Sequence, residues 1–562
     1  MSKVVTIANE QVREAVLAAL GAAVAAGELP AEPIPAFTIE IPGDRAHGDL
    51  ATNAAMVSAR TFRQAPRKIA ETILAHLALE GTYLERAEVA GPGFLNFFLS
   101  PAFYAAVVED ILAQGEAYGR SDYGQGKKIL VEFVSANPTG PMHIGNARGG
   151  AIGDCLASVL DWAGYQVSRE FYINDAGNQI QKFGLSLEKR YLQLYRDGVE
   201  MPEDSYHGQD IIDHAKAFAA LYGDKYVDAP EEERRQALVD YALPLNIAGL
   251  ERDLLTYRIR YDNWFRESTL HENGEARHVV ELLTDKGYTY EKEGAVWFKA
   301  TDFGADKDFV LVRSNGLLTY VVPDIAYHYN KLVTRGFDKA IDILGADHHG
   351  YVPRLKAALQ ALGVDPNRLD VVMMQMVRLI RDGEVIKASK RSGKAITLVT
   401  LLEEIPIDAA RFYFNLREAN SQFDFDLDLA IEQSASNPVY YVQYAHARIC
   451  SLFKKMEKEG VTMRACTPAE LARLTAPEEK ELVRLLAAFT GEIVEAAKDY
   501  DPARITKYCT ELATLFHKFY NSCRVGGVEE PLMQARLALC DATRTTLRNA
   551  LDLLKISAPE SM

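Results

Sequence analysis

Cysteine is scarce in this chain of 562 residues, and no two cysteines stand in a C-x-x-C pair. Zinc sites and disulfide frameworks both depend on clustered cysteines, so this spacing argues against either one. We expect reduced, mostly buried thiols in a cytoplasmic protein. The six scattered positions are Cys155, Cys450, Cys466, Cys509, Cys523 and Cys540.

Long apolar runs are also missing, and none is long enough to span a membrane. The alanine-rich residues 16–26 imitate the core of a signal peptide, but Glu10, Arg13 and Glu14 precede them. A signal peptide begins with a positively charged region, so we interpret this stretch as an amphipathic helix.

Strongly basic runs are absent as well. The formal net charge is −16, from 62 lysines and arginines against 78 aspartates and glutamates. Because lysine and arginine dominate nucleic-acid affinity by neutralising phosphates, this balance by itself argues against an RNA partner. The apolar content of 48% and the charged content of 25% are those of an ordinary soluble globular protein. The length allows roughly three or four domains.

A turn rich in glycine and proline, within residues 132–150, separates a predicted buried strand at 128–135 from a predicted helix. Free backbone N–H groups gather at a helix N-terminus, so this turn favours an anionic ligand such as a phosphate. His143 adds a side-chain donor there, although a structural histidine in a tight turn would give the same pattern. The apolar residues at helical spacing are Ile152, Leu156, Val159 and Ala163.

A second small-residue loop, Lys387-Ala-Ser-Lys-Arg-Ser-Gly-Lys394, carries mobile cations after the strand-like residues 371–379. A basic loop alone is usually a solvated surface loop. Together with the histidine turn, however, it resembles the two signatures of class I aminoacyl-tRNA synthetases, written H-I-G-H and K-M-S-K-S. His143-Ile-Gly-Asn146 stands for the first signature and Lys387-Ala-Ser-Lys-Arg391 for the second.

Further segments resemble bacterial arginyl-tRNA synthetase over nearly the whole chain. This resemblance implies an α/β protein with a class I Rossmann-type parallel-sheet catalytic domain, an N-terminal α/β add-on domain and an all-α C-terminal anticodon-binding bundle. It implies a ligase that activates L-arginine with ATP and transfers it from arginyl-adenylate to the terminal ribose of tRNA(Arg). The segments lie at residues 172–177, 317–327, 345–351, 437–448 and 547–562.

We expect three domains from the same resemblance. Residues 1–119 would be the add-on domain that contacts tRNA, residues 120–420 the catalytic domain, and residues 421–562 the helical anticodon-binding domain. Charged helical patterning predicts a helical or mixed insertion at about 186–297. The Asp-Ala-Leu-Arg motif that names the last domain is blurred, with Gln534-Ala-Arg536 near its place.

Phosphoryl and acyl transfer both develop negative charge, so well-placed donors and cations should do most of the catalysis. Asn146 replaces the second histidine of its signature and can donate from a similar reach, while Ala388 replaces the common methionine. We expect Mg²⁺ only as a partner of the ATP phosphates, with no protein-only metal site. The resemblance assigns catalysis to His143, Gly145, Asn146, Lys387, Ser389 and Lys390. It assigns ATP binding to Pro138, Gly140, His143, Gly145, Asn146, Lys387, Lys390 and Arg391.

Arginine demands acceptors, because its guanidinium group has five donors and no acceptor. Two carboxylates in a plane would also reject lysine, whose ammonium cannot form a bidentate fork. The structural alternative for Asp324 is a helix N-cap before Ile325. The resemblance assigns arginine binding to Glu132, Ser135, Asn137, Tyr320, Asp324 and His348.

The helix that opens after Asn437 carries a core stripe and an adjoining polar aromatic face. On that second face, Tyr440, Gln443 and Tyr444 could stack on unpaired bases and hydrogen-bond to them. Tyrosines buried between helices are the structural alternative. The core stripe consists of Tyr441, Ala445, Ile449, Leu452 and Met456.

Asp347-His348-His349 also invites interpretation as a metal site, but adjacent residues at a strand end point in different directions. The resemblance assigns this segment to the substrate and ribose pocket. It further implies a monomer.

Two other functional classes stay open. A small-molecule nucleotidylyltransferase shares the His-x-Gly turn but needs neither this length nor a helical C-terminal domain. A synthetase-like RNA-binding protein would be free to lose Lys390, His143 or Glu132, and all three are present. The related cysteinyl-tRNA synthetase would need thiolate ligands for zinc that this chain lacks.

Overall fold

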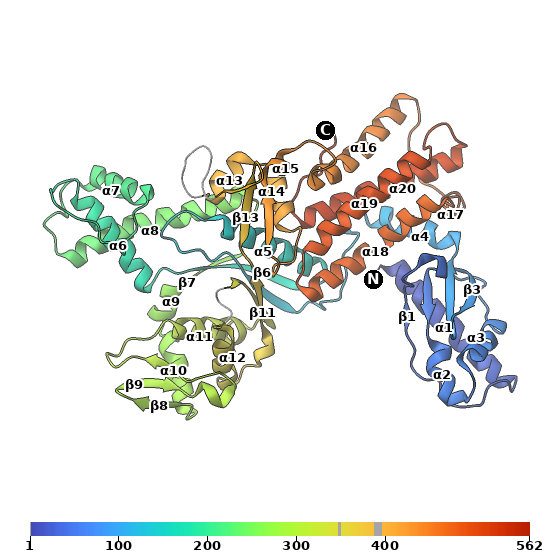
Figure 1. The fold of residues 1–562 in the computed structure, drawn as a ribbon, viewed down its shortest axis with the longest axis horizontal. Coiled ribbons are helices and arrows are strands. Elements are labelled where there is room, and N and C mark those ends of the chain that lie inside the picture. Colours follow the sequence, from blue (N-terminus) through green and yellow to red (C-terminus); the bar gives the residue numbers. More distant parts are fainter. Residues whose placement is uncertain (1, 347–349, 387–395) are drawn as a thin grey trace.

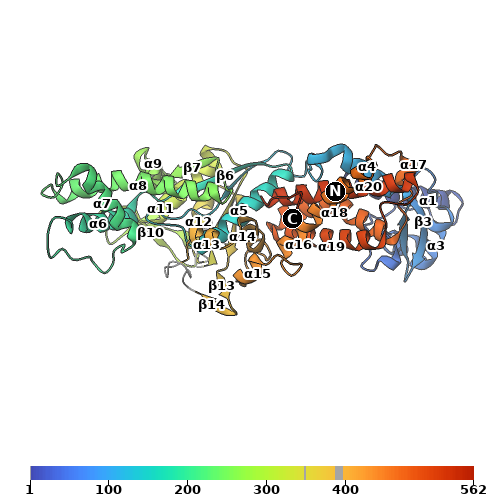
Figure 2. The same cartoon turned by 90° about the horizontal axis from the view of Figure 1, so that it is seen from above.

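The computed structural model describes residues 2–346, 350–386 and 396–562. Figures 1 and 2 show an elongated molecule in which the N-terminal domain, in blue, and a green helical unit of residues 177–256 lie at opposite ends. None of the helices in this described part of the chain combines the length and the apolar composition of a membrane span.

A five-stranded sheet forms the centre of the chain and consists of β5 (Lys128–Glu132), β6 (Gln166–Ile173), β7 (Asn263–Arg266), β11 (Lys339–Gly345) and β12 (Leu369–Met374). The strand order is β12-β11-β5-β6-β7, and every neighbouring pair is parallel. The chain builds one side of the sheet outward from β5 and then returns to build the other side. Such a switch point binds ligands at the carboxyl ends of its strands. The predicted fold class is confirmed.

Helix α5 (Ile144–Trp162) crosses from β5 to β6 and is almost entirely buried. Gly153 lies so close to the Phe133 ring that a Cβ atom at this position would clash with it. The strand predicted at 128–135 ends early, at Glu132. It ends there because Val134 and Ser135 have φ angles of 71° and 40°, which turn the chain away from the extended conformation.

The range 186–297, predicted as one insertion, contains two separate units and a strand of the main sheet. The first unit is helical and consists of α6 (Gly177–Leu192), α7 (Gln209–Tyr222) and α8 (Glu231–Thr256). Strand β7 then returns to the parallel sheet, where Trp264 stacks on Phe171 with ring centroids 4.5 Å apart. The second unit consists of α9 (Glu267–Glu272), α10 (Glu275–Asp285), β8 (Thr289–Lys292), β9 (Ala295–Phe298) and β10 (Phe309–Val312).

Two further helices flank the second half of the main sheet. Helix α11 (Val321–Tyr329) precedes β11 and continues into a π-helical turn, Asn330–Thr334. Helix α12 (Val352–Ala361) crosses from β11 to β12. A π-helical turn inserts one extra residue per turn and is frequent at functional sites.

A smaller sheet follows β12, with the order β14-β13-β15. The strand-like residues 371–379 therefore belong to two strands of two sheets, because the chain leaves β12 at Met374 and enters the next strand at Val377. The elements of this unit are β13 (Val377–Arg381), β14 (Glu384–Ile386), α13 (Leu398–Glu404), α14 (Ile407–Phe414), β15 (Phe423–Asp426) and α15 (Leu427–Ile431).

The N-terminal domain has mixed α/β structure, with an antiparallel sheet of order β1-β2-β4-β3. The alanine-rich stretch near residue 20 lies in a 23-residue helix whose Val12, Val16 and Leu20 side chains are buried in the core. The elements are α1 (Lys3–Ala25), β1 (Ile39–Glu40), β2 (Leu50–Thr52), α2 (Ala54–Phe62), α3 (Pro66–Ala75), β3 (Leu84–Ala90) and β4 (Phe94–Leu99). Helix α4 (Pro101–Gln114) follows and packs chiefly against helices of the C-terminal region.

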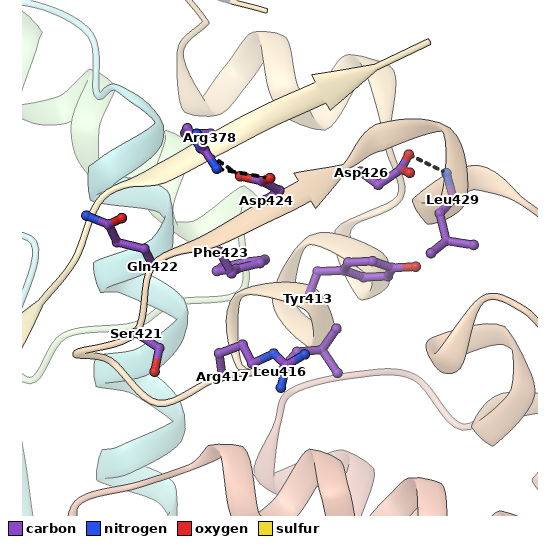
Figure 3. Close-up of a pocket in the computed structure, with 10 residues that line it drawn as sticks. All are labelled: Arg378, Tyr413, Leu416, Arg417, Ser421, Gln422, Phe423, Asp424, Asp426 and Leu429. Atoms are coloured by element: carbon purple, nitrogen blue, oxygen red, sulfur yellow. Dashed lines mark hydrogen bonds and ion pairs between the residues drawn. The ribbon is translucent and has the colours of Figure 1, made fainter. Parts of the chain in front are cut away.

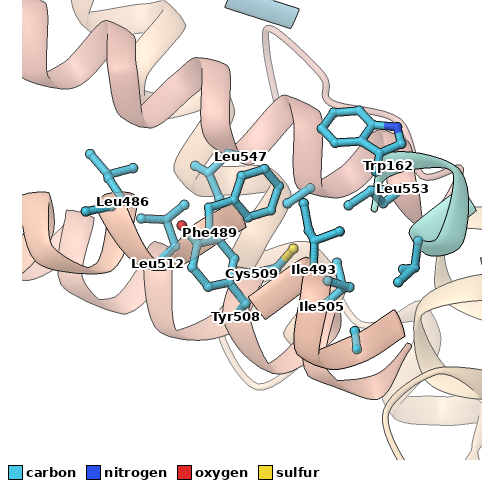
Figure 4. Packing of buried hydrophobic residues seen from close by; sticks show 14 of the residues in the cluster. Trp162, Leu486, Phe489, Ile493, Ile505, Tyr508, Cys509, Leu512, Leu547 and Leu553 are labelled. Carbon is cyan, nitrogen blue, oxygen red and sulfur yellow. The ribbon is translucent and has the colours of Figure 1, made fainter. Parts of the chain in front are cut away.

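The C-terminal region is helical and consists of α16 (Pro438–Lys458), α17 (Pro468–Leu471), α18 (Pro477–Asp499), α19 (Ala503–Ser522) and α20 (Glu530–Leu553). Figure 4 shows Trp162, at the end of α5, packed against this bundle. Its ring meets Phe489 edge-on, with centroids 6.4 Å apart. The bundle and the main sheet therefore share one hydrophobic core.

Candidate active site

The turn after β5 places His143 as the N-cap of α5. Its Nδ1 atom accepts a hydrogen bond from the Gly145 amide at 3.1 Å. In return, the Asn146 side-chain oxygen accepts one from the His143 amide at 3.0 Å. The two residues thus form a reciprocal capping box, so His143 has the structural role in the turn that was the alternative to ligand binding. The Gly145 amide, which we expected to face phosphates, is used inside the turn.

The same geometry defines what His143 offers to a ligand. Because Nδ1 is the acceptor, a neutral ring carries its proton on Nε2 and donates from there. Burial lowers the pKa of His143 below its ordinary value, which favours that neutral form. The residue is still exposed overall, so its capping role and a ligand-binding role are compatible.

A pocket of about 600 Å³ opens beside this turn and brings together five residues that the sequence analysis singled out: Ser135, Asn137, Gly140, His143 and Asn146. Pro138 is buried next to them, and its carbonyl accepts a hydrogen bond from the side-chain amide of Asn246 on α8 at 2.9 Å. The opposite wall comes from the loop before α7 and from the first turn of that helix, a segment that was not predicted to belong to the site. Its lining residues are Tyr206, His207, Gly208 and Asp210.

Lys387, Ser389, Lys390 and Arg391 of the second signature lie outside the described residues, as does His348. The described chain resumes immediately beside the histidine turn. Thr397 pairs with His143 in an isolated antiparallel bridge, and the amide of Leu398 donates to the Met142 carbonyl at 2.9 Å. The residues that follow the second signature are therefore hydrogen-bonded to the histidine turn of the first.

Asp324 lies inside α11, four residues after its N-cap Tyr320, so the alternative role of Asp324 as an N-cap is wrong. Its Oδ2 atom accepts a hydrogen bond from the Tyr351 hydroxyl at 2.5 Å. Burial raises the pKa of the Asp324 carboxyl. Tyr320 is 74% exposed, and its ring centroid lies 6.5 Å from that of Tyr351.

Glu132 is held by contacts within the protein. Its Oε2 atom accepts a hydrogen bond from the Lys331 ammonium at 2.6 Å, and its Oε1 atom accepts one from the Ser135 hydroxyl at 2.8 Å. Both oxygens are therefore occupied within the protein. Lys331 is shared with Asp342, to which its ammonium donates at 2.9 Å, so Glu132 belongs to a buried ion network, and its role as a guanidinium acceptor stays a prediction.

Glu267 is the acidic residue that sequence reasoning missed. It begins α9 directly after β7, at the carboxyl edge of the sheet. Burial raises the pKa of its carboxyl, and the negative charge of Asp324 nearby raises it further. Two carboxylates with raised pKa therefore lie on different elements, close enough for their charges to interact, and the Glu267 carboxylate also lies 3.7 Å from the His271 imidazole. The sequence signal that could have identified Glu267 is the strand at 263–266, because a residue directly after a parallel strand lies at the carboxyl edge of the sheet. The prediction of one insertion over this range left that strand out.

Three possible metal ligands, on Glu132, His328 and Asp342, lie within 4.8 Å of one another. The Lys331 ammonium, however, donates to both carboxylates, at 2.6 Å to Glu132 and 2.9 Å to Asp342. A fixed cation thus lies among them, and we interpret the cluster as a buried ion network.

On α16, the rings of Tyr440 and Tyr444 stack with centroids 6.3 Å apart and an angle of 5° between their planes. Tyr444 is 40% exposed, and the Arg448 guanidinium lies 5.9 Å from its ring centroid. Gln443 differs from the expectation. It is buried, and its side-chain nitrogen donates to Asp408 at 2.8 Å and to the Ser557 carbonyl at 2.9 Å.

Gln534 and Arg536 are also structural rather than exposed. Gln534 is buried and bonds to the backbone at Thr462 and Arg464, and Arg536 donates to Glu479 at 2.7 Å. Later on α20, Asp541-Ala-Thr-Arg544 is a closer match to Asp-Ala-Leu-Arg than Gln534-Ala-Arg536 is.

Figure 3 shows a separate pocket of about 590 Å³ beside β13 and β15. Arg378 at its rim donates to both carboxylate oxygens of Asp424, at 2.7 and 3.1 Å, so its charge is already paired. None of the residues predicted for a site lines this pocket, and we assign it no role.

Known families match nearly the whole chain in three parts. The N-terminal domain of arginyl tRNA synthetase matches residues 10–99. The catalytic domain of class I (R) tRNA synthetases matches residues 107–217 and 220–451. The DALR anticodon binding domain matches residues 442–562.

Individual proteins agree with these matches. The arginine–tRNA ligase of Caldanaerobacter subterraneus subsp. tengcongensis is 57% identical over 562 residues, covering 100% of both chains. That of Acetivibrio thermocellus is 53% identical over 564 residues, again covering 100% of both. The structure of Thermus thermophilus arginyl-tRNA synthetase has a TM-score of 0.73 over 99% of this chain and 100% of that one; at 23% identity it supports the fold. The chain therefore belongs to the arginyl-tRNA synthetases of class I.

Proposed function

We propose that this chain is a cytoplasmic, monomeric arginine–tRNA ligase that activates L-arginine with ATP and transfers the arginyl group to tRNA(Arg) in protein biosynthesis. The observation that carries the proposal is the full-length match to arginine–tRNA ligases at up to 57% identity. The site is consistent with it, because a phosphate-type helix terminus and a pair of carboxylates lie at the same switch point of the sheet.

The ATP end of the site would be the turn from Ser135 to Asn146. The Nε2 proton of His143 and the N-terminus of α5 suit an anionic phosphate. Lys387 and Lys390 would close over the phosphates from the second signature, with Mg²⁺ held by the phosphates themselves. One well-placed donor to a developing anion contributes about 3 to 4 kcal/mol in comparable sites.

Asp324 and Glu267 would form the arginine end of the site, a change from the predicted pair of Asp324 and Glu132. Their carboxylates can accept a guanidinium fork, and binding of that cation would favour their ionised forms. Asn137 is exposed in the pocket and would hold the α-amino or carboxylate end of arginine. Lysine would leave one carboxylate poorly paired, which gives selectivity for arginine.

The stacked tyrosines of α16, Tyr440 and Tyr444, would bind unpaired bases of the tRNA. Aromatic faces stack on any base, and Arg448 beside Tyr444 adds a cation for the RNA backbone. On a chain with a net charge of −16, local cations of this kind would supply the attraction that the overall composition lacks.

Arginine-dependent exchange between ATP and pyrophosphate, measured with and without tRNA(Arg), tests the proposal. Lysine and cysteine serve as control amino acids. Exchange with arginine alone among the three supports the ligase, and its dependence on tRNA decides whether activation needs the RNA. If no exchange occurs with or without tRNA(Arg), the result would favour an RNA-binding protein without catalysis. If exchange occurs without dependence on any amino acid, the result would favour a nucleotidylyltransferase.

A further inference from the structure

Two adjacent residues after β5 hold a backbone conformation that side chains rarely adopt. Val134 has a φ of 71° and Ser135 a φ of 40°. A β-branched residue such as valine is especially unfavourable in this region. Such strain persists only where the surroundings enforce it, and it is common at active sites. The strained turn leads directly into the pocket through Asn137.

Ser135 ties this turn to the sheet. Its hydroxyl donates to Glu132 Oε1 at 2.8 Å and accepts a hydrogen bond from the Tyr172 amide at 3.1 Å. Glu132 ends β5, and Tyr172 lies near the end of β6. One side chain therefore connects the turn with both strands, and its own position depends on the orientation of the Glu132 carboxylate.

Lys331 holds the Glu132 carboxylate through its other oxygen. Its ammonium group is fully buried and donates to Glu132 Oε2 at 2.6 Å and to Asp342 Oδ1 at 2.9 Å. The other oxygen of Asp342 lies 2.6 Å from His328 Nε2, and His328 Nδ1 lies 2.7 Å from the Asp324 carbonyl. A continuous chain of polar contacts thus runs from the strained turn to the helix that carries Asp324.

Lys331 can make this connection because of where it stands. It lies on the π-helical turn that continues α11, one turn beyond His328. From this position a single ammonium reaches β5 and β11 at once. It joins the turn at the ATP end of the pocket to the helix at the guanidinium end.

We propose that Lys331 is a positioning residue that holds the two ends of the substrate pocket in one geometry, through Glu132 and Ser135 on one side and Asp342 and His328 on the other. This inference rests on the proposed function for its kinetic consequence. Lys331 touches no substrate in this scheme. Its loss would misalign arginine and ATP, and a displacement of about 1 Å in such a site can cost on the order of 100-fold in rate.

Lys331→Met tests the kinetic consequence, with Lys339→Met as its matched control. Lys339 begins β11, at the end of the strand away from the site, and its ammonium also pairs with a carboxylate, Asp370, at 2.5 Å. We expect Lys331→Met to lower kcat for arginine activation on the order of 100-fold, and Lys339→Met to change it less than about threefold. A purely structural lysine would lower the melting temperature and leave kcat unchanged below it, which would overturn the proposal.

Hydrogen exchange tests the geometry without any need for activity. In the full-length protein, Lys331→Met and Ser135→Ala should each speed amide exchange in residues 133–142 and at Tyr172, whereas Lys339→Met should not. Ser135→Ala removes only a hydroxyl, so it keeps the test valid even where Lys331→Met does not fold. Unchanged exchange in Ser135→Ala would overturn the proposal. If the wild type showed no arginine activation, the proposed function would fail while this measurement still decided the role of Lys331.

Discussion

Replacing Asp324 by asparagine tests how the pocket selects arginine. The substitution keeps the size of the side chain and removes one anionic acceptor, while the hydroxyl of Tyr351 remains as a donor at the same place. The guanidinium would then face Glu267 alone. Breaking a buried charge pair by removing one partner costs about 3 to 5 kcal/mol. This predicts a loss of roughly 100- to 5,000-fold in kcat/KM for arginine.

The assay is aminoacylation of tRNA(Arg) over a range of arginine and ATP concentrations. Asp324→Asn should act through arginine, leaving the KM for ATP within about twofold. Glu132→Gln is the control, because both oxygens of Glu132 are already bonded to Lys331 and Ser135. It should affect the kinetics of arginine and of ATP together. A normal arginine KM in Asp324→Asn, with a selective loss of arginine in Glu132→Gln, would refute the assignment.

Four further results are expected. His143→Ala should lower the rate of activation far more than the affinity for ATP, and a rise in the ATP Michaelis constant alone would contradict a transition-state role. Burial raises the pKa of Asp324 and of Glu267, and only the ionised carboxylates pair with a guanidinium group. The KM for arginine, measured between pH 5 and 8, should therefore rise on acidification, and this rise should begin at a higher pH than the pKa of an ordinary carboxyl would give. A KM that does not change with pH would count against both residues. Tyr444→Ala should weaken tRNA binding by about 1 to 3 kcal/mol in a filter-binding assay and leave tRNA-independent binding of arginine unchanged by calorimetry. Trp162→Ala should destabilise the contact between α5 and the bundle by about 3 to 5 kcal/mol, seen as an earlier thermal transition that the exposed-site variant Leu17→Ala does not show.

Elements with local signals could be predicted from the sequence alone. The histidine turn was recognisable because a strand pattern, a run of glycine and proline and a helical repeat follow one another within about twenty residues. The core stripe of α16 was recognisable for the same reason, and Ala445, Ile449 and Leu452 are buried as predicted. Both features depend on neighbours along the chain.

Long-range contacts decided the rest. Glu132 and Gln443 carry side chains suited to ligand binding, yet each is occupied by residues far away in the sequence, Lys331 and Asp408. Glu267 shows the converse. It has no local motif, and only the return of β7 to the parallel sheet brings it beside Asp324.

The difference has one physical cause. A periodic pattern reports which face of an element is apolar, and burial of that face follows wherever the element packs. The partner of a buried charge depends instead on which strands become neighbours, and in this chain the order β12-β11-β5-β6-β7 brings together segments more than a hundred residues apart. The sequence alone therefore predicted the chemistry of the site, whereas the partners of each carboxylate follow from the tertiary structure.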